Sequence, residues 1–127
     1  MSNTRNARRW QPWAMAMGVI AILALIGSQL LPNDDSAQQQ GKLTYNDNCA
    51  SCHGADLQGT RQGPPFLHQV YEPSHHGDEA FYRAIANGVQ AHHWRFGDMP
   101  AVPNVSREQA SDIIAYIREQ QRAAGIK

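Results

Sequence analysis

The longest apolar stretch of the sequence runs from Trp13 to Leu31, nineteen residues without a charge. A helix of that length spans about 28 Å, close to the hydrocarbon thickness of a bilayer. Three arginines lie within residues 1–12, and Trp10 and Trp13 occupy the positions of an interfacial aromatic belt. The pattern therefore predicts a transmembrane anchor over residues 13–31, with residues 1–12 on the cytoplasmic side and the remainder of the chain exported.

A cleavable signal peptide is the alternative interpretation of this stretch. Such a peptide has a shorter apolar core, followed by a cleavage site with small residues at alternate positions. Asp35 disfavours the candidate site at residues 36–37, and two bulky residues precede the candidate at residues 27–28. The pattern favours an uncleaved anchor, with cleavage as the alternative.

Residues 32–40 are polar after the initial proline and have no large side chain to bury. This composition is typical of a flexible tether. We therefore expect a tether over residues 32–40 and a globular domain over residues 41–127.

The clearest helical pattern of that domain lies near its end. Ser106 and Gln109 have the spacing of a capping box. Four apolar residues then recur at helical spacing on one face, namely Ala110, Ile113, Ile114 and Ile117. Gly125 is the expected stop.

Two further helices are predicted in the domain. One covers Asp78–Asn87, with acidic residues in its first turn and Gly88 as a left-handed cap. The other covers residues 41–52, with Leu43 and Tyr45 as candidates for the core. The Gly- and Pro-rich residues 58–73 should form a loop. Because no stretch alternates convincingly, the predicted fold class is all-α.

Charge is unevenly distributed, although the whole chain has a formal charge of zero. After Leu31 there are 8 Lys and Arg residues against 11 Asp and Glu residues, a net charge of 8 − 11 = −3. Nucleic-acid binding needs a basic face, so an acidic domain argues against such a partner. The charge instead suits rapid docking to a basic patch on another protein.

The chemistry of the chain centres on Cys49-Ala50-Ser51-Cys52-His53, which holds its only two cysteines. The C-x-x-C-H spacing is typical of a c-type haem attachment site. Two thiols on one helical turn can each add to a haem vinyl group, and the adjacent His53 can then ligate the iron.

Other uses of two cysteines fit this sequence less well. A zinc site needs four ligands, and no second C-x-x-C supplies them. A thioredoxin-like redox pair needs a preceding hydrophobic strand, which the sequence before Cys49 lacks. A disulfide across two residues is sterically unfavourable.

Taken together, the motifs resemble those of class I mono-haem c-type cytochromes, in a membrane-anchored form. In chain order they are Gly41-x-x-x-Tyr45-x-x-x-Cys49-x-x-Cys52-His53, Gly63-Pro64-Pro65-Phe66-Leu67, Met99-Pro100 and Ile113-Ile114-Ala115-Tyr116-Ile117. The resemblance covers nearly all of residues 41–124 and implies one covalent haem c within a small helical bundle.

The resemblance also implies how parts of the site are arranged. The first and last helices of the family cross near the haem, so Gly41 and Tyr45 should meet the face around Ile113 and Tyr116. A loop proline carbonyl of the family accepts a hydrogen bond from the proximal histidine and fixes its orientation. Here that residue is expected to be Pro65, with Pro64 as the alternative because this chain has one extra residue in the motif.

Met99 is the expected sixth ligand of the iron, because the other three methionines precede residue 18. A thioether ligand raises the reduction potential, and a saturated iron passes electrons without binding substrate. The alternatives are an open iron or a second histidine ligand, from His68, His75, His76, His92 or His93.

Two histidine pairs, His75-His76 and His92-His93, raise the question of a second metal, since imidazole suits copper and zinc. Adjacent residues on a helix or strand point apart, which favours exposed or propionate-contacting histidines instead. Trp94 and Arg95 are candidates to line the haem and to hydrogen-bond a propionate.

The sequence therefore predicts a carrier of single electrons, not an enzyme, with its haem domain on the periplasmic side of the cytoplasmic membrane. The expected partners are a membrane oxidase, a reductase or a dehydrogenase. The alternatives are a haem subunit of a larger oxidoreductase and a catalytic or gas-sensing protein with an open iron site.

Overall fold

The computed structural model describes residues 34–127, which form short and medium-length helices joined by long loops. In chain order these are α2 (Asp34–Asn48), α3 (Ala50–His53), the 3-10 helix η1 (Gln69–Tyr71), α4 (Asp78–Asn87) and α5 (Arg107–Ala123). The only β-pairing within residues 34–127 is an isolated antiparallel bridge between Val89 and Met99. The predicted all-α class is therefore confirmed for this part of the chain.

The predicted cytoplasmic segment (1–12) and transmembrane anchor (13–31) lie outside the described residues. Among the helices that the structure does describe, none combines the length and the apolar character needed to cross a bilayer.

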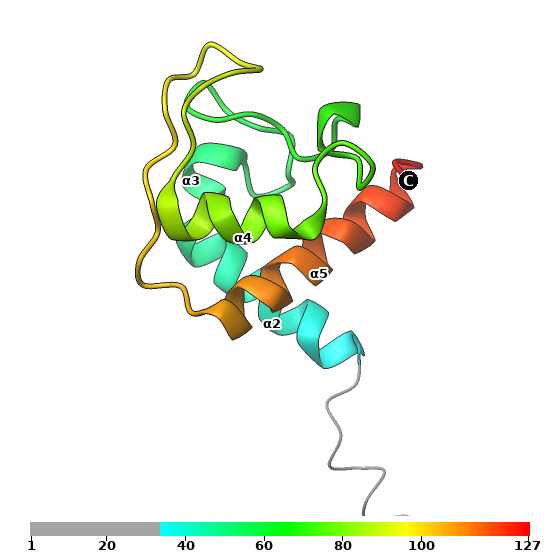
Figure 1. Cartoon of the computed structure of the whole chain (residues 1–127). Helices are drawn as coiled ribbons and strands as arrows, with labels where there is room; N and C mark the ends of the chain where they lie inside the picture. Colours follow the sequence, from blue (N-terminus) through cyan, green and yellow to red (C-terminus); the bar gives the residue numbers. More distant parts are fainter. Residues whose placement is uncertain (1–33) are drawn as a thin grey trace, which may run out of the picture. The chain divides into compact units, whose positions relative to one another are not determined.

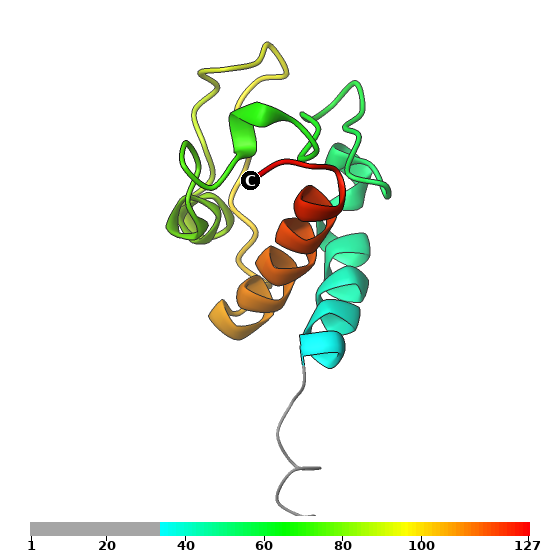
Figure 2. The same ribbon diagram turned by 90° about the vertical axis from the view of Figure 1, so that its right-hand side faces the viewer.

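Helices α2 and α5 cross each other (Figures 1 and 2). Their facing side chains supply much of the core. Tyr45 of α2 is fully buried, and its ring centroid lies 5.6 Å from that of Tyr116 on α5. Gly41, one turn earlier, is buried against the backbone of α5 at Asp112. The expected crossing of the first and last helices through Gly41 and Tyr45 is confirmed.

Two expectations for α2 were wrong. The tether predicted over residues 32–40 is helical from Asp34 onward, because no glycine or proline interrupts residues 34–40 and alanine and glutamine favour a helix. Leu43 is 55% exposed rather than in the core. Gly41 and Tyr45 are four residues apart and share the inward face, so Leu43, midway between them, lies on the opposite side.

The two other predicted helices are confirmed. At the start of α5, the Ser106 hydroxyl accepts a hydrogen bond from the Gln109 amide, and the Gln109 side chain accepts one from the Ser106 amide. Helix α4 covers the predicted residues and ends at Gly88, which has a φ of +76° and a ψ of −178°. The positive φ was expected, but the extended ψ takes the chain directly into the bridge between Val89 and Met99.

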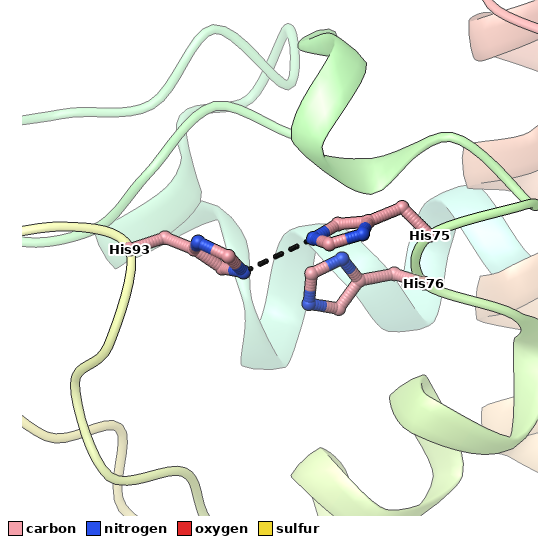
Figure 3. Close-up of side chains that lie close together, drawn as sticks. All are labelled: His75, His76 and His93. Atoms are coloured by element: carbon pink, nitrogen blue, oxygen red, sulfur yellow. Dashed lines mark hydrogen bonds between the residues drawn. The ribbon is translucent and has the colours of Figure 1, made fainter.

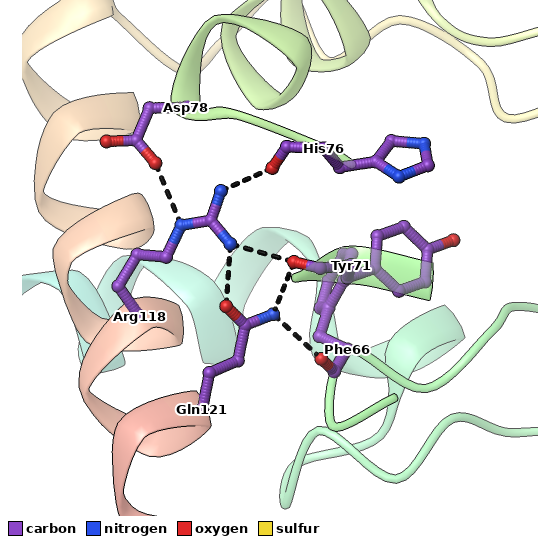
Figure 4. Close-up of polar contacts among 6 residues, drawn as sticks. All are labelled: Phe66, Tyr71, His76, Asp78, Arg118 and Gln121. Atoms are coloured by element: carbon purple, nitrogen blue, oxygen red, sulfur yellow. Dashed lines mark hydrogen bonds and ion pairs between the residues drawn. The ribbon is translucent and has the colours of Figure 1, made fainter. Parts of the chain in front are cut away.

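The loop between α3 and α4 is fastened to α5 by two polar side chains (Figure 4). Arg118, which is 7% exposed, donates hydrogen bonds to the carbonyls of Tyr71 and His76 and to the carboxylate of Asp78. Gln121 donates to the carbonyls of Phe66 and Tyr71. These bonds satisfy buried carbonyls that have no helix or sheet partner, and they fix the shape of a loop that lines the site described next.

Candidate functional site

A cavity of about 770 Å³ opens between the loops and helices α3, α4 and α5. Its volume is within the range of about 300–1,000 Å³ that is usual for cofactor and ligand pockets. The cavity is lined by five of the residues predicted from the sequence to hold the haem: Cys49, Cys52, His53, Trp94 and Met99. Residues that are far apart in the chain are therefore gathered around one space.

Cys49, Cys52 and His53 are presented by a single turn of helix. The amides of Cys52 and His53 both donate to the carbonyl of Cys49, at 3.1 and 2.9 Å. Both thiols are partly buried, and burial raises the pKa of Cys49 to about 11. Since the thiolate is the reactive form of cysteine, a thiol enclosed in this way is poorly nucleophilic at neutral pH. Both thiols line the cavity from this turn, together with His53.

His53 is held in one orientation by the loop that follows. Its Nδ1 lies 2.9 Å from the carbonyl oxygen of Pro64, so Nδ1 carries the proton and Nε2 is left free to bind a metal. The ring is stacked on Phe66 at a centroid distance of 4.2 Å. Burial, the largest influence, lowers the pKa of His53, which favours the neutral imidazole that a metal requires.

The carbonyl partner of His53 was expected to be that of Pro65, and this was wrong. Gly63 packs directly on α3: a Cβ on Gly63 would lie 2.9 Å from the carbonyl oxygen of Cys52. This contact brings the next residue, Pro64, beside the imidazole. The extra residue of the motif left both prolines as candidates, and this contact selects Pro64.

Met99 reaches the cavity from the opposite part of the chain. Its amide and carbonyl are each paired with Val89 at 2.9 Å, which fixes the backbone on both sides of the hydrogen-bonded pair. Gly88 lies against the carbonyl of Met99, where a Cβ would be 2.4 Å from the oxygen. The thioether side chain is half-buried and lines the cavity with His53.

Trp94 and Arg95 differ in their positions. The Trp94 indole nitrogen is buried and makes no hydrogen bond of normal geometry within residues 34–127. Arg95 is exposed and is not among the residues that line the cavity, and its contact with a propionate stays a prediction. In this loop Trp94 takes the inward position, and Arg95 faces solvent.

An arginine that sequence reasoning missed does line the cavity. Arg83 of α4 contributes to the wall together with Ala80 and Asn87. These residues are three and four apart, the spacing of one helix face. This spacing is the sequence signal that could have identified Arg83, because it places Arg83 beside the apolar face formed by Phe81 and Ala84.

Both histidine pairs also reach the cavity rim, whereas His68 caps η1 through a hydrogen bond from the Val70 amide to its Nδ1. His75 and His76 were expected to point apart, yet both approach His93. The two residues lie in a turn before α4, not in a helix or strand, so the expected divergence does not apply. Partial desolvation is the main influence that lowers the pKa values of His76 and His93.

The residues around the cavity fit a covalent haem. Two thiols on one turn can form the thioethers, the free Nε2 of His53 and the thioether of Met99 are iron-ligand types, and the walls are mainly apolar. The buried indole N–H of Trp94 is a donor that a propionate oxygen could satisfy.

Comparison with known proteins agrees with this chemistry. The model of the family described as Cytochrome c matches residues 38–121. The cbb3-type cytochrome c oxidase subunit FixP of Rhizobium meliloti is 32% identical over 88 residues, covering 68% of this chain and 28% of that protein. FixP of Sinorhizobium medicae is 51% identical over 37 residues, covering 28% and 13%, and FixPc of Rhizobium leguminosarum bv. viciae is 36% identical over 56 residues, covering 43% and 20%.

The chain thus spans less than a third of the length of each of these curated relatives. No solved structure matches it.

Proposed function

Because the chain belongs to the cytochrome c family, we propose that it carries single electrons on a haem whose axial ligands are His53 and Met99. Membership itself establishes a class I c-type cytochrome, with a covalent haem c at Cys49 and Cys52 and a role in electron transport. The axial ligand pair, the partners and the membrane anchor are the proposed parts.

When bound, the haem supplies reversible one-electron chemistry. The protein contributes the arrangement of its ligands. The Pro64 carbonyl orients the His53 imidazole, and the Val89 pairing holds the backbone of Met99. Both ligands are thus held in place by contacts with backbone atoms. Little movement of the ligands is needed when the haem gains or loses an electron, and this favours rapid electron transfer.

The observation that carries the proposal is the convergence of His53 and Met99 on one apolar cavity that also holds both cysteines. The soft thioether of Met99 would raise the reduction potential relative to an exchangeable water ligand. It would also occupy the position that a gas or peroxide needs.

Met99→Ala tests the ligand assignment in the purified haem protein. We expect it to lower the potential, to remove the ferric sulfur-to-iron absorption band and to allow rapid binding of carbon monoxide to the ferrous form. His76→Asn is the matched control, because His76 lies at the rim of the same cavity. If Met99→Ala changes none of these properties, the proposed ligand is wrong. Rapid carbon monoxide binding by the wild type would favour the open-iron catalytic or gas-sensing alternative.

The printed names of the relatives favour one partner class. FixP is described as a subunit of a cbb3-type cytochrome c oxidase, so we propose that this chain passes electrons to a membrane oxidase, either as a free shuttle or as a fixed haem subunit. Its acidic domain suits a basic docking face. Affinity purification in mild detergent distinguishes a shuttle from a fixed subunit. A fixed subunit should stay with the oxidase in a constant ratio at high salt, whereas a shuttle should dissociate from it.

The apolar run over residues 13–31 supports a membrane-tethered protein with its haem domain on the periplasmic side. In the native host, the haem-stained band should remain in the membrane after an alkaline wash. Replacing residues 1–31 with a cleavable signal peptide should release it into the periplasmic fraction. Release of the native chain by the wash would contradict an uncleaved anchor.

A further inference from the structure

Three histidines meet at the rim of the cavity, and none of them is required by the proposed electron carrier. His75 and His76 lie in the turn before α4, and His93 lies in the loop between α4 and α5 (Figure 3). One ring nitrogen from each residue lies within 4.8 Å of the others. Two separate segments of the chain therefore bring three imidazoles to one point.

We propose that His75, His76 and His93 bind a zinc or copper ion at a second metal site, separate from the haem iron. Imidazole is a preferred ligand of both metals. Three protein ligands leave one coordination position for water or another molecule, as in open zinc sites.

The spacing of the two exposed rings agrees with coordination. His75 Nε2 and His93 Nε2 are 3.3 Å apart. Two nitrogens that bind a tetrahedral ion at about 2.0–2.1 Å are separated by roughly 3.3 Å, from the bond length and the tetrahedral angle. The third ring, that of His76, has a nitrogen within 4.8 Å of both.

The third ring, that of His76, is positioned by two hydrogen bonds from outside the cluster. Its Nδ1 donates to the carbonyl of Val70, which leaves the Nε2 lone pair available for a metal. Its own carbonyl accepts from the buried guanidinium of Arg118 on α5 (Figure 4). A metal site needs such outer contacts to hold its ligands in place. Here they come from Val70 of η1 and Arg118 of α5.

His92 lies next to the cluster and is a candidate for the remaining position. Its ring centroid is 4.4 Å from that of His93 and 6.2 Å from that of His76. In the structure it is turned away, with its Nδ1 2.8 Å from the carbonyl of Gln90. We therefore assign the three-histidine set as the site and treat His92 as its nearest neighbour.

Isothermal titration of the haem-loaded full chain with Zn²⁺, using protein purified without a histidine tag, tests the site. We expect one ion per haem and an affinity at least tenfold weaker in His75→Asn and in His93→Asn. His68→Asn is the control, because it removes an exposed histidine outside the cluster and keeps an oxygen to cap η1. Its affinity should equal that of the wild type.

The visible spectrum of each variant gives a second measurement that does not depend on zinc. Each spectrum should match that of the wild type. Such a match would show that the domain is folded and that neither His75 nor His93 ligates the iron. A changed spectrum in His93→Asn would overturn the proposal, because His93 would then be a haem ligand. Equal loss of zinc affinity in all three variants, or no binding by the wild type, would overturn it as well. The Met99→Ala experiment is independent of these outcomes.

Discussion

Gly41 on α2 lies directly against the main chain of Asp112 on α5, so closely that a Cβ on Gly41 would be 1.9 Å from the Asp112 carbonyl oxygen. This is where the two long helices cross. The neighbouring obstacle is backbone, not a side chain that could rotate away. Any side chain at residue 41 must therefore separate the helices that hold Tyr45 and Ile113 in the core.

Gly41→Ala should lower the free energy of unfolding of the haem protein by about 3 kcal/mol or more, the upper range for inserting atoms into a packed interior. Denaturant unfolding followed by circular dichroism measures it. Gly77→Ala is the control, because a Cβ there would meet only the Pro73 carbonyl oxygen at 3.7 Å. Its cost should stay below about 1 kcal/mol. Equal effects of the two substitutions would show that the helix crossing tolerates expansion.

Local rules predicted the parts of the fold whose signals are local. The capping box of Ser106 and Gln109 needs only a fixed spacing, and the C-x-x-C-H turn specifies its own chemistry. Helix α4 was predicted residue for residue because acidic residues mark its start and Gly88 its end. These features do not depend on what the rest of the chain does.

The errors occurred where contacts between distant segments of the chain determine the position of a residue. Pro64 rather than Pro65 reaches His53 because Gly63 packs on α3, a contact between segments that no local pattern reports. Arg83 was missed because the orientation of α4 is what brings it to the cavity. The convergence of both histidine pairs on one rim likewise depends on how the two loops fold.

A second prediction concerns Gly88, which couples the end of α4 to Met99. An added Cβ would lie 2.4 Å from the Met99 carbonyl oxygen, in a residue whose φ is already +76°. Gly88→Ala should displace the Met99 segment, weaken the sulfur-to-iron band and lower the potential of the haem protein. Absorption spectroscopy and a redox titration measure these changes.

Gly125→Ala separates the effect of this contact from that of backbone strain. Gly125 has a φ of +79°, but a Cβ there would have no atom within 4 Å. The substitution should cost about 1–2 kcal/mol of stability through its conformation alone, with the spectrum and the potential unchanged. If Gly88→Ala also leaves both haem properties unaltered, the position of Met99 is not set by this contact.

The third prediction concerns Arg118, the buried side chain that holds the loop before α4. Arg118→Met removes the donors to the His76 carbonyl and to the buried side-chain oxygen of Gln121, whereas the Tyr71 carbonyl still accepts a hydrogen bond from Gln121. Unsatisfied buried polar groups cost about 1–3 kcal/mol each, so we expect a loss of about 3 kcal/mol in the free energy of unfolding, measured with denaturant.

The ion pair of Arg118 with Asp78 should contribute much less than the carbonyl contacts. The Asp78 side chain is 60% exposed, and exposed pairs typically contribute up to about 1 kcal/mol. Asp78→Asn should therefore cost less than about 1 kcal/mol in the same assay. A cost of Asp78→Asn as large as that of Arg118→Met would show that the charge pair, not the carbonyl contacts, holds the loop.

The fourth prediction concerns Tyr45, whose buried hydroxyl donates a 2.7 Å hydrogen bond to the Gly54 carbonyl just after the C-x-x-C-H turn. Burial raises the pKa of Tyr45 above its usual value of about 10. A group whose pKa is higher in the folded state contributes its full stability below the unfolded pKa, and this contribution is lost as the pH rises through the folded value. Wild-type stability should thus fall above pH 10 in part because unfolding lets Tyr45 ionise.

Tyr45→Phe removes both the hydrogen bond and this ionisation. At pH 7 to 9 the variant should be less stable than the wild type by about 1 kcal/mol, a difference that stays constant over this interval because neither state of Tyr45 is ionised. Above about pH 10, the wild type should lose stability more steeply, so the difference should shrink. Denaturant unfolding at a series of pH values measures both regimes. A difference that stays constant up to pH values well above 10 would mean that Tyr45 ionises as readily in the folded protein as in the unfolded chain, and that its burial does not oppose the charge.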